Sequence, residues 1–504
     1  MGLPARSDHL AALRPCLASW STERECDTGP VPALHPDVLD VFEGSDSHLQ
    51  FDDGTSRSAR ELADDGRRLA AWLSKQGLEP GNRIPIRLPN GIEYLQLLLA
   101  CAAGGFIAVS VNTRYSDDEA ADLVERSGAR TVDVAASLDG APPEWATATP
   151  MERVHRREDG FVVFTTSGTT SRPKMVLQQQ CSIADHAVDA ATRFGYRPND
   201  TVMAVMPLCG TFGLGSLMAA VVAGCRIVVN NFALALTAAL IESERVTCLN
   251  GSDDMFHRLL EHGTDVSMVR LGGYARFNTS LDGVVERAAA AGATLTGLYG
   301  MSEVQALFTL RDPSGDAADR TRAGGTLSSL HAAYRVVDGE LQLRGPSLFA
   351  GYLAEGGEHI DAELTAQHHD DGWFRTGDLA AADGDRTFEY IARMGDVLRL
   401  GGFLVSPAEI EAVLMDDDAV DAAQVVAIDL PNGARPVGFV VGAGEGFVES
   451  TAIDRCRHRL GRYKVPVRVL VIDEFPTTPG PNGTKIQKSE LRKIAARLLG
   501  VSGG

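Results

Sequence analysis

The feature that most constrains the fold is a regular alternation of helix-like and strand-like segments over the first third of the chain. Residues 59–76 carry apolar side chains at helical spacing, and Gly77 follows them at the position where glycine often ends a helix. Residues 83–88 then alternate apolar and polar side chains, as a half-buried strand does. Strands that alternate with helices predict βαβ units, and therefore an α/β fold with a parallel sheet.

The alternation continues further along the chain. The predicted segments are a helix at 92–103, a strand at 106–111, a helix that Ser116 and Glu119 begin as a capping box and that ends near Gly128, and a second α/β stretch at 161–310. Residues 135–160 are predicted to be an exposed connection and residues 311–326 a polar, glycine-rich loop, whereas residues 334–343 alternate like antiparallel strands. The residues after Arg393 form a further short α/β unit, large enough to be a domain.

Length and composition are those of a folded globular protein. The 504 residues are 44% hydrophobic and 23% charged, which excludes a disordered chain, a collagen and a coiled coil. The 47 Lys and Arg residues against 67 Asp and Glu residues give a net charge of −20. This charge opposes general binding to phosphate backbones, so we expect no nucleic-acid partner, although a local pocket could still hold a small anion.

Cysteine usage and the apolar stretches predict a cytoplasmic protein. The 8 cysteines include no CxxC pair and no metal-ligand spacing, which is typical of reduced thiols, and MGLPARSDHL lacks the apolar core of a signal peptide. Residues 94–113 carry no charge, but Gly104 and Gly105 split them into a helix-like and a strand-like half. Residues 213–241 contain Arg226, which would cost ~2.5–3.5 kcal/mol in a bilayer. We therefore expect no transmembrane segment.

The motif that is most informative about chemistry is FVVFTTSGTTSRPK at 161–174. An apolar strand leads into a loop of hydroxyl-bearing and small residues that ends at Lys174. Hydroxyl groups and flexible backbone let several donors converge on phosphate oxygens, and the lysine adds a positive charge. The spacing of Gly168 and Lys174 differs from the Walker pattern GxxxxGK[ST]. On this motif alone, a solvated turn rich in Ser and Thr stays open as the alternative.

TTSGTTSRPK resembles the phosphate loop of the adenylate-forming superfamily, which comprises acyl-CoA synthetases, aryl-CoA ligases, luciferases and the adenylation domains of peptide synthetases. Further motifs of that family follow in order: LYGMSEV at 298–304, GWFRTGDL at 372–379, ARMGDVLRLGGFLVSPAEIE at 392–411, GRYKVPVRVLVIDEFP at 461–476 and NGTKIQK at 482–488. The match covers the chain from about Val38 to Leu498.

The resemblance implies the fold and the domain organisation. The fold would be α/β, with a large N-terminal domain of stacked α/β sheets and a distorted antiparallel β subdomain, plus a small mobile α+β C-terminal domain. The implied N-terminal AMP-binding domain comprises residues 1–394, with the pocket for ATP and the acid. The implied C-terminal domain comprises residues 395–504, with the hinge at Gly395 and the catalytic Lys485.

The resemblance also implies a set of nucleotide-binding residues. They are Thr166, Ser167, Gly168, Thr169, Thr170, Lys174, Tyr299, Ser302, Asp378 and Arg393. The Asp378 carboxylate could accept two hydrogen bonds from a ribose diol, the Tyr299 ring offers a flat face for adenine, and Arg393 would meet ribose or phosphate. Their alternative interpretations are a turn or capping aspartate, a core tyrosine and an arginine in a surface ion pair.

Glu303 and Lys485 are the residues that the resemblance assigns to catalysis. Glu303 is a hard oxygen ligand suited to Mg²⁺, and an ordinary surface glutamate is the alternative. Lys485 would bridge the attacking carboxylate and the α-phosphate, and so stabilise charge that develops in the transition state. Lys464 and Lys488 are nearby bases with less support. The basic run 455–468 meets CoA phosphates in one interpretation and is a solvated helix face in the other.

The chain departs from the family pattern at several positions. Ser171 replaces a glycine of the phosphate loop and Ser302 replaces a threonine, both small changes. Gly395 stands where Asp or Lys is usual, and glycine tolerates the backbone change that a domain rotation demands. Cys209 and Gly210 replace an aromatic residue and a histidine that line the acyl channel in many members. The channel is therefore expected to be wider, or to be filled from elsewhere.

The implied substrate pocket carries few charges, which favours an apolar acyl or aryl group. Its residues are Cys209, Gly210, Phe212, Gly273, Tyr274 and Met301. We interpret Cys209 as a small buried hydrophobe and not as a catalytic thiol. Arg276 is the rival feature, because facing inward it would select an acid with a second anionic group; we expect it to face solvent or a surface carboxylate.

These motifs predict an ATP-dependent carboxylic acid:CoA ligase that uses ATP, Mg²⁺ and coenzyme A, acting as a monomer or homodimer on a medium-chain, long-chain or aryl acid. After adenylation, the small domain would swing about Gly395 and bring the Gly401-Gly402 region to the active site for attack by the CoA thiol. The alternatives are an acyl-AMP ligase that loads a carrier protein, a stand-alone amino-acid adenylating enzyme, an oxidative light-emitting member and an inactive nucleotide-binding regulator. MPLCGTFGL lacks the aspartate that would pair an amino group, and the presence of Glu303, Asp378 and Lys485 argues against the regulator.

Overall fold

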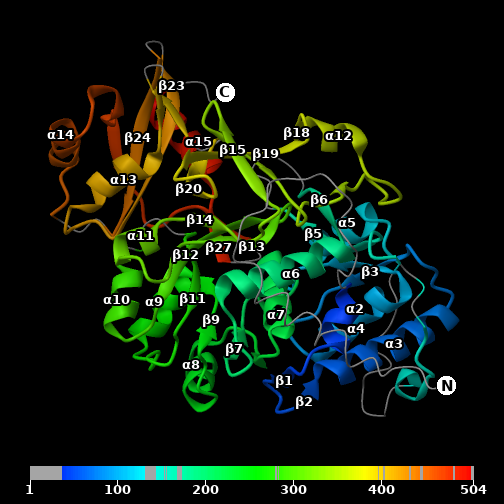
Figure 1. Ribbon diagram of the computed structural model, residues 1–504. Coiled ribbons are helices and arrows are strands. Elements are labelled where there is room, and N and C mark those ends of the chain that lie inside the picture. The colour runs from blue at the N-terminus through cyan, green and yellow to red at the C-terminus, as the bar shows by residue number, and fades with distance from the viewer. Residues whose placement is uncertain are drawn as a thin grey trace.

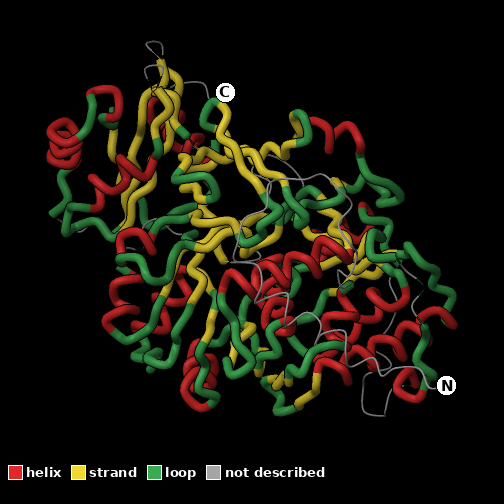
Figure 2. The backbone as a smooth tube through the Cα atoms, viewed as in Figure 1, coloured by secondary structure: helices red, strands yellow, loops and turns green. Residues whose placement is uncertain are grey.

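The computed structural model describes residues 37–130, 144–152, 154, 156–166, 173–277, 281, 283–394, 397–400, 403–430, 433–442, 446–480 and 483–500 (Figure 1). Up to residue 394, the described chain forms layered sheets with helices packed against them. Figure 2 shows most helices in the lower half of the view and a band of strands across the upper half.

The first sheet has the strand order β17-β6-β5-β4-β3. Its strands are β3 (Arg83–Ile86), β4 (Ile107–Ser110), β5 (Gly160–Thr165), β6 (Met175–Gln179) and β17 (Gly351–Tyr352). β3, β4 and β5 are parallel, as the sequence predicts, whereas β6 returns antiparallel to β5. The described ends of the phosphate-loop motif therefore lie at two adjacent strands, of which β5 is the central strand of this sheet.

The second sheet has the order β2-β1-β8-β7-β9, and helices lie between it and the first sheet. Its strands are β1 (His48–Phe51), β2 (Ser56–Ser58), β7 (Thr201–Ala204), β8 (Arg226–Val229) and β9 (Cys248–Leu249). The packed helices are α2 (Val38–Glu43), α3 (Ala59–Lys75), α4 (Ile92–Gly104), α6 (Gln180–Phe194) and α7 (Thr211–Val222). α4 and α6 contact strands of the first sheet, α7 contacts β7 and β8, and α2 touches α4, α6 and α7. Together these layers enclose the main hydrophobic core.

The predicted helix ends agree with the structure in this region. α5 (Asp117–Arg126) begins with the predicted capping box, because the Glu119 N–H donates to the Ser116 hydroxyl (3.2 Å) and the Ser116 N–H donates to the Glu119 carboxylate (2.8 Å). Gly77 adopts a positive φ of 85° directly after α3 and its cap, as expected for a glycine that ends a helix.

The third sheet changes from parallel to antiparallel along its width, in the order β10-β11-β12-β13-β14-β20-β19-β16-β15. Its strands are β10 (Gly251–Ser252), β11 (Gly272–Ala275), β12 (Leu295–Met301), β13 (Gln305–Leu310), β14 (Gly324–Leu327), β15 (Ala333–Val337), β16 (Glu340–Arg344), β19 (Trp373–Ala382) and β20 (Thr387–Arg393), with β18 (His369–Asp370) paired to β19. Helices α8 (Leu234–Ser243), α9 (Asp253–Glu261), α10 (Val284–Ala290) and α12 (Ala362–Gln367) complete this part. β10, β11 and β12 are parallel, and the antiparallel pairing of β15 with β16 confirms the prediction for 334–343.

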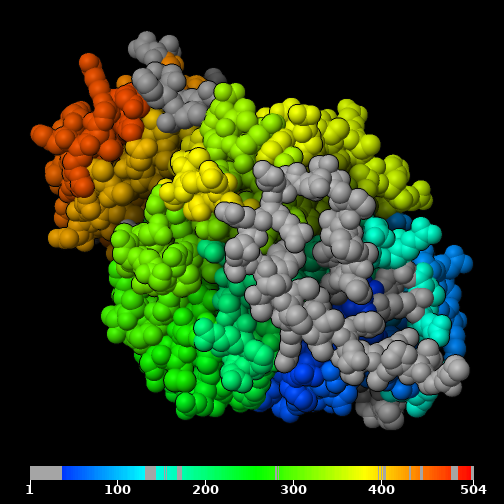
Figure 3. All heavy atoms as spheres, in the orientation of Figure 1, coloured from blue at the N-terminus to red at the C-terminus, as the bar shows by residue number. Residues whose placement is uncertain are grey.

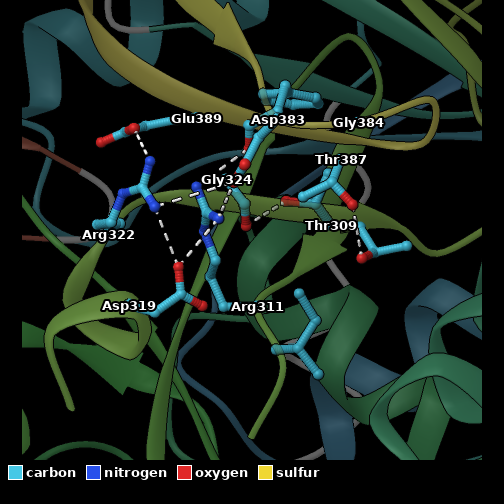
Figure 4. A network of polar contacts seen from close by, with 12 residues as sticks. Thr309, Arg311, Asp319, Arg322, Gly324, Asp383, Gly384, Thr387 and Glu389 are labelled. Atoms are coloured by element: carbon cyan, nitrogen blue, oxygen red, sulfur yellow. Dashed lines mark hydrogen bonds and ion pairs between the residues drawn. The ribbon is translucent and has the colours of Figure 1, made fainter. Parts of the chain in front are cut away.

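The prediction of a loop at 311–326 is wrong. This segment holds α11 (Ala317–Thr321) and the start of β14. The polar residues of this segment gave the wrong prediction because they take part in a network around a buried arginine: the Arg311 side chain is only 3% exposed and pairs with the partly exposed carboxylates of Asp319 and Asp383 (Figure 4). Charged residues that pair with one another around a buried arginine carry the same sequence pattern as a solvated loop.

The predicted exposed connection at 135–160 is also partly wrong. Residues 131–143 lie outside the described part of the chain. The short 3₁₀ helix η2 (Glu144–Thr147) follows them, and its Trp145 is 3% exposed and packs in the main core. The sequence signal for the burial of this segment was Trp145 itself, a single large apolar side chain among polar residues.

The two long apolar stretches of the sequence are divided between separate elements. Residues 94–113 supply most of α4 and all of β4, and residues 213–241 supply parts of α7 and α8 together with β8. In the described residues, no helix is both long enough and apolar enough to cross a membrane.

The chain after residue 397 builds its own hydrophobic cores. Its elements are β21 (Leu398–Leu400), β22 (Phe403–Val405), α13 (Pro407–Met415), β23 (Ala422–Leu430), β24 (Gly433–Val441), α14 (Glu449–Arg459), the 3₁₀ helix η3 (Arg462–Lys464), β25 (Arg468–Val471), β26 (Thr477–Gly480), β27 (Gly483–Ile486) and α15 (Lys488–Leu499). Two clusters of buried apolar residues draw only on this part, and the clusters of the larger part draw only on residues before 394. In Figure 3 the orange residues form a lobe at one corner of the molecule.

Candidate active site

The phosphate-loop motif is described at its two ends. The Thr166 N–H donates to the Lys174 carbonyl oxygen at 3.1 Å, so the ends of the loop are hydrogen-bonded to each other beside the β5–β6 pair. Of the predicted phosphate ligands, Ser167, Gly168, Thr169 and Thr170 lie outside the described residues, as does Ser171. Their roles remain predictions, and the observed geometry concerns Thr166 and Lys174.

Asp378 is a buried carboxylate at the centre of a polar cluster that unites three of the predicted residues, of which the Arg393 side chain is 44% exposed. Asp378 itself is 3% exposed, accepts a hydrogen bond from the Tyr299 hydroxyl on Oδ2 (2.6 Å) and pairs through Oδ1 with the Arg393 guanidinium (2.5 Å). These residues come from β19, β12 and β20, and Asp378 lies directly opposite Arg393 in the antiparallel register. Burial with two partners argues against a simple turn aspartate and leaves a fixed carboxylate.

The Tyr299 ring was predicted to offer a flat face for adenine, but in the structure it is packed against other side chains. Its ring is buried and packs edge-on against Phe388, with ring centroids 5.2 Å apart. Burial and the neighbouring Asp378 carboxylate raise the pKa of the Tyr299 hydroxyl well above its ordinary value, so the hydroxyl remains a hydrogen-bond donor. In this structure Tyr299 orients Asp378, and contact with adenine stays a prediction.

Glu303 is buried and is not the surface glutamate of the alternative interpretation. It is 4% exposed, and the Tyr352 hydroxyl donates to its Oε1 at 2.8 Å. Burial raises the pKa of the Glu303 carboxyl, while Arg393 and Lys174 favour its charged form. Glu303 lies in the turn between β12 and β13, and a backbone contact holds this turn: the Phe349 N–H donates to the Glu303 carbonyl oxygen at 2.8 Å. Ser302 is held similarly through its carbonyl oxygen, by the Gln178 side chain at 2.9 Å.

The donor set around Glu303 fits a magnesium ion that arrives with a nucleotide. In the described part of the chain, no group of three or more His, Cys, Asp or Glu side chains is placed to hold a metal. Mg²⁺ does not need such a cage, because it is commonly bound by one or two carboxylates together with water and substrate phosphates. A single buried carboxylate close enough to Lys174 to influence its charge matches that requirement.

Lys174 contacts two rings, those of His368 and Tyr352, which the sequence analysis did not predict. Its ammonium nitrogen is 2.8 Å from Nε2 of His368 and 4.8 Å from the centre of the Tyr352 ring. Burial lowers the pKa of Lys174, and Glu303 opposes this shift. His368 and Tyr352 are thus functional candidates that sequence reasoning missed. The available signal was the His-His pair just before GWFRTGDL.

The predicted substrate-pocket residues divide into buried packing residues and small residues at element ends. Phe212 and Tyr274 are buried in the main core, on α7 and β11. Gly210 caps the start of α7, and Cys209 before it is half-buried. Burial raises the pKa of the Cys209 thiol to about 11, so little of it is thiolate at neutral pH. This agrees with the interpretation of Cys209 as a small hydrophobe.

Gly273 is a position where a side chain would force its neighbours to move. Its N–H donates to the Asn250 side-chain oxygen at 2.8 Å, and a Cβ here would stand 2.6 Å from that same atom. Met301 is half-buried with its sulfur 3.5 Å from the Tyr299 hydroxyl. Arg276 is half-buried directly after β11, so its predicted orientation toward solvent or a surface carboxylate stays a prediction.

Comparison with known proteins assigns the family. The sequence model of the AMP-binding enzymes matches residues 40–353, and that of the AMP-binding enzyme C-terminal domain matches residues 409–480. The chain belongs to the AMP-binding enzyme family.

This AMP-binding enzyme is similar to several CoA ligases. A ligase of Mycobacterium tuberculosis named for a methyl-dioxo-octahydro-indenyl propanoyl group is 28% identical over 484 residues, covering 87% of this chain and 94% of that protein. A 2-succinylbenzoate–CoA ligase of Bacillus cereus is 26% identical over 455 residues, covering 84% and 91%.

Two solved structures share the fold of this AMP-binding enzyme. ATP-bound MatB from Rhodopseudomonas palustris superposes with a TM-score of 0.79 at 22% identity, covering 91% of this chain and 99% of that one. O-succinylbenzoate coenzyme A synthetase from Bacillus subtilis in complex with AMP has a TM-score of 0.78 at 23% identity, covering 91% and 98%. At these identities the likeness concerns the fold.

The C-terminal part of this AMP-binding enzyme carries the predicted Lys485 on a hairpin. Lys485 belongs to β27 and pairs through its backbone with Thr478 of β26. The structure describes its backbone position and not its side chain, and Gly395 and the Gly401-Gly402 pair lie outside the described residues. The catalytic role of Lys485 and the hinge at Gly395 therefore remain predictions.

The basic run of the C-terminal part is matched by acidic residues of the same part. Arg455 pairs with Asp417 at 3.0 Å, Arg468 pairs with Glu449 at 2.7 Å, and Lys464 pairs with Glu409. Lys488 lies 3.8 Å from the buried Glu411. These pairs favour a charge-balanced face over a surface reserved for CoA phosphates.

Proposed function

We propose that this AMP-binding enzyme is an ATP-dependent carboxylic acid:CoA ligase that acts through an acyl-adenylate. The observation that carries the proposal is the buried Asp378, held by Tyr299 and Arg393 on the mixed sheet, with Glu303 in the turn between β12 and β13 of that sheet. A carboxylate fixed in this way is suited to bind a ribose diol through its oxygens. The CoA-ligase names of the related proteins support the same reaction class.

In the first half-reaction, a carboxylate oxygen of the acid attacks the α-phosphorus of ATP. The new P–O bond forms as the bond to pyrophosphate breaks, and pyrophosphate leaves with the electron pair. The 166–174 loop with Lys174 would hold the polyphosphate, Asp378 the ribose, and Lys485 the two anions that meet. Mg²⁺, held by Glu303 and phosphate oxygens, would supply charge neutralisation when bound.

In the second half-reaction, the CoA thiol attacks the acyl carbon of the adenylate. The C–S bond forms, the C–O bond to AMP breaks with its electron pair going to AMP, and the thiol proton passes to solvent. We propose that residues 1–394 and 395–504 act as two domains and that a rotation at Gly395 exchanges the Lys485 hairpin for the Gly401-Gly402 region. The separate hydrophobic cores on either side of this boundary support such a rotation, since it need not disturb either core.

The acid that fits the pocket is apolar, and we propose a medium-chain, long-chain or aryl acid. Cys209 and Gly210, at the start of α7, are small residues where many family members carry an aromatic residue and a histidine, and the nearby Phe212 and Tyr274 are buried in the main core. Both related ligases described above are named for ring-bearing acids. A pocket of this kind discriminates gradually, by about 1–3 kcal/mol for each methylene.

The test is pyrophosphate release from ATP across a panel of acetate, octanoate, benzoate and malonate, each with and without CoA. The proposal expects release with octanoate or benzoate, and an acyl-CoA product only when CoA is present. Release without any acyl-CoA product would point to a carrier protein as the thiol acceptor. Malonate as the best substrate would contradict the apolar pocket and make Arg276 the specificity residue.

A further inference from the structure

We propose that His368 is a positioning residue that holds the Lys174 ammonium group in place for the polyphosphate of ATP, an inference that rests on the proposed function. His368 ends α12, and its ring nitrogen Nε2 lies 2.8 Å from the Lys174 ammonium nitrogen. The two residues are separated by 194 positions in the sequence, so the fold alone brings them together.

The tautomer of His368 follows from its other ring nitrogen. Nδ1 lies 2.9 Å from the carbonyl oxygen of Leu364, and a carbonyl oxygen can only accept, so Nδ1 carries the proton. In the neutral ring Nε2 is then a bare acceptor. It therefore accepts one of the three N–H donors of the Lys174 ammonium group, and this hydrogen bond to a charged donor is of the stronger kind.

The backbone of His368 is fixed on two sides. Its N–H donates to the Thr365 carbonyl oxygen within the last turn of α12 (3.1 Å), and its carbonyl oxygen accepts from the Arg375 N–H of β19 (2.7 Å). β19 also carries Asp378, so one strand supports both the proposed ribose ligand and the acceptor for Lys174. An acceptor on such a rigid support can restrict a flexible lysine before the ligand arrives.

The surroundings keep the His368 ring neutral. Burial lowers the pKa of His368, and the charges of Lys174, His369 and Arg375 act in the same direction. Tyr352 covers the ring edge-on, with centroids 5.1 Å apart, and its own ring lies under the Lys174 ammonium group. Lys174 is thus held between an aromatic face and an acceptor, which reduces the freedom that it loses when ATP binds.

The experiment compares His368→Phe with His368→Gln in the full-length chain and measures the affinity for ATP with Mg²⁺ by titration calorimetry. Phenylalanine keeps a ring against Tyr352 and removes the acceptor, so we expect about tenfold weaker binding. Glutamine supplies an acceptor at similar reach, so we expect affinity within about threefold of the wild type. His369→Phe is the matched control, since His369 stacks on Phe349 and not on Lys174, and we expect no change.

A double-mutant cycle with Lys174→Met decides whether His368 acts through the lysine. If it does, adding His368→Phe to Lys174→Met weakens ATP binding by less than about twofold. Additive losses would overturn the proposal, and so would equal losses with Phe and Gln accompanied by equal falls in melting temperature, which would indicate packing. A wild-type chain that does not bind ATP would overturn the proposed function and this inference with it. A wild type that binds, with a Phe variant that binds equally well, would overturn this inference alone.

Discussion

The two ends of the β19–β20 hairpin use the same side-chain chemistry for different purposes. At the turn, Arg311 bonds Asp319 (3.3 Å) and Asp383 (2.6 Å), and Arg322 pairs with Asp319 and Glu389 (Figure 4). At the open end, the Asp378 carboxylate is held by Tyr299 and Arg393. Each cluster joins one buried charged side chain, Arg311 at the turn and Asp378 at the open end, to charged partners that are partly exposed.

The two clusters connect different parts of the fold. The turn cluster joins the hairpin to α11 and to the β13–β14 pair, and the Thr309 hydroxyl adds a bond to the Gly324 carbonyl oxygen at 2.7 Å. The open-end cluster stands beside the last residues before the C-terminal part, where the Met394 N–H donates to the Gly377 carbonyl oxygen at 2.8 Å. An ion pair with one buried member therefore does not by itself indicate a functional site; the proposed site at the open end is supported by the position of its residues in the family motifs.

The largest expected effect is at the open end. Asp378→Asn keeps the size of the side chain and removes its charge, which weakens the pair with Arg393 and the proposed grip on the ribose. We expect kcat/KM for ATP to fall by about 100-fold in pyrophosphate release, a loss of about 2.7 kcal/mol in transition-state binding. Asp383→Asn at the turn is the matched control, expected to keep activity within about threefold. Equal losses in the two variants would break the comparison.

Lys485→Ala tests whether the C-terminal part contributes Lys485 to the site of adenylate formation. Removing a cation that stabilises charge in the transition state should slow adenylate formation by about 100-fold. Transfer to CoA from a preformed acyl-adenylate should persist, because the lysine is needed only while carboxylate and phosphate meet. Both half-reactions are measured separately by rapid quench. A parallel fall of the two rates would contradict the proposed domain rotation.

Arg311→Met should act on stability and not on catalysis. The variant removes the shared partner of Asp319 and Asp383 and keeps much of the apolar stem volume. Because both carboxylates reach solvent in part, we expect a loss of about 2 kcal/mol in the free energy of unfolding, below the range for fully buried pairs. Urea unfolding measures this loss. Activity per folded molecule that fell tenfold or more would show that the turn cluster also shapes the site.

The smallest effect concerns a buried polar group without charge, His186 on α6. Its Nε2 lies 2.5 Å from the Ala306 carbonyl oxygen, and burial lowers the pKa of His186 from 6.5 to about 4. The unfolded chain therefore binds the proton first, so stability is lost as pH falls through 6.5 toward 4. At pH 5.5 the loss relative to pH 7.5 should be about 1 kcal/mol. His186→Gln should lack this part of the pH dependence in urea unfolding; an unchanged dependence would rule His186 out as its source.

The sequence predicts the open-end cluster far better than the turn cluster. Asp378, Tyr299 and Arg393 each lie in a contiguous motif, so their roles can be proposed one at a time. That the three side chains meet depends on the β19–β20 register and on β12, which no local pattern encodes. At the turn, the charges of 311–326 look like those of a solvated loop, because burial of a charge is decided by partners distant in sequence.

The same limit explains the residues that were missed near Lys174. His368 stands outside every motif, and only the approach of α12 to the end of the phosphate loop gives it a role. Glu303 was foreseen as a ligand, yet its burial and its bond from Tyr352 come from the packing of β17 and could not be inferred. Helix ends were easier to predict from the sequence, since a capping side chain forms its hydrogen bond with a backbone group only a few residues away.

Arg393 has a consequence for energetic linkage between the two parts of the chain. Its side chain is a partner of Asp378, while its carbonyl oxygen accepts from the Val397 N–H at 3.0 Å, where the chain leaves β20. Arg393 thus contacts both the proposed ribose ligand, through its side chain, and the start of the C-terminal part, through its backbone. If occupancy by a nucleotide changes the preferred path of the chain after β20, then the path must change nucleotide affinity by the same factor, because such coupling is reciprocal. Binding of ATP and release of AMP could then each favour a different position of the C-terminal part through Arg393, and so set the order of the two half-reactions.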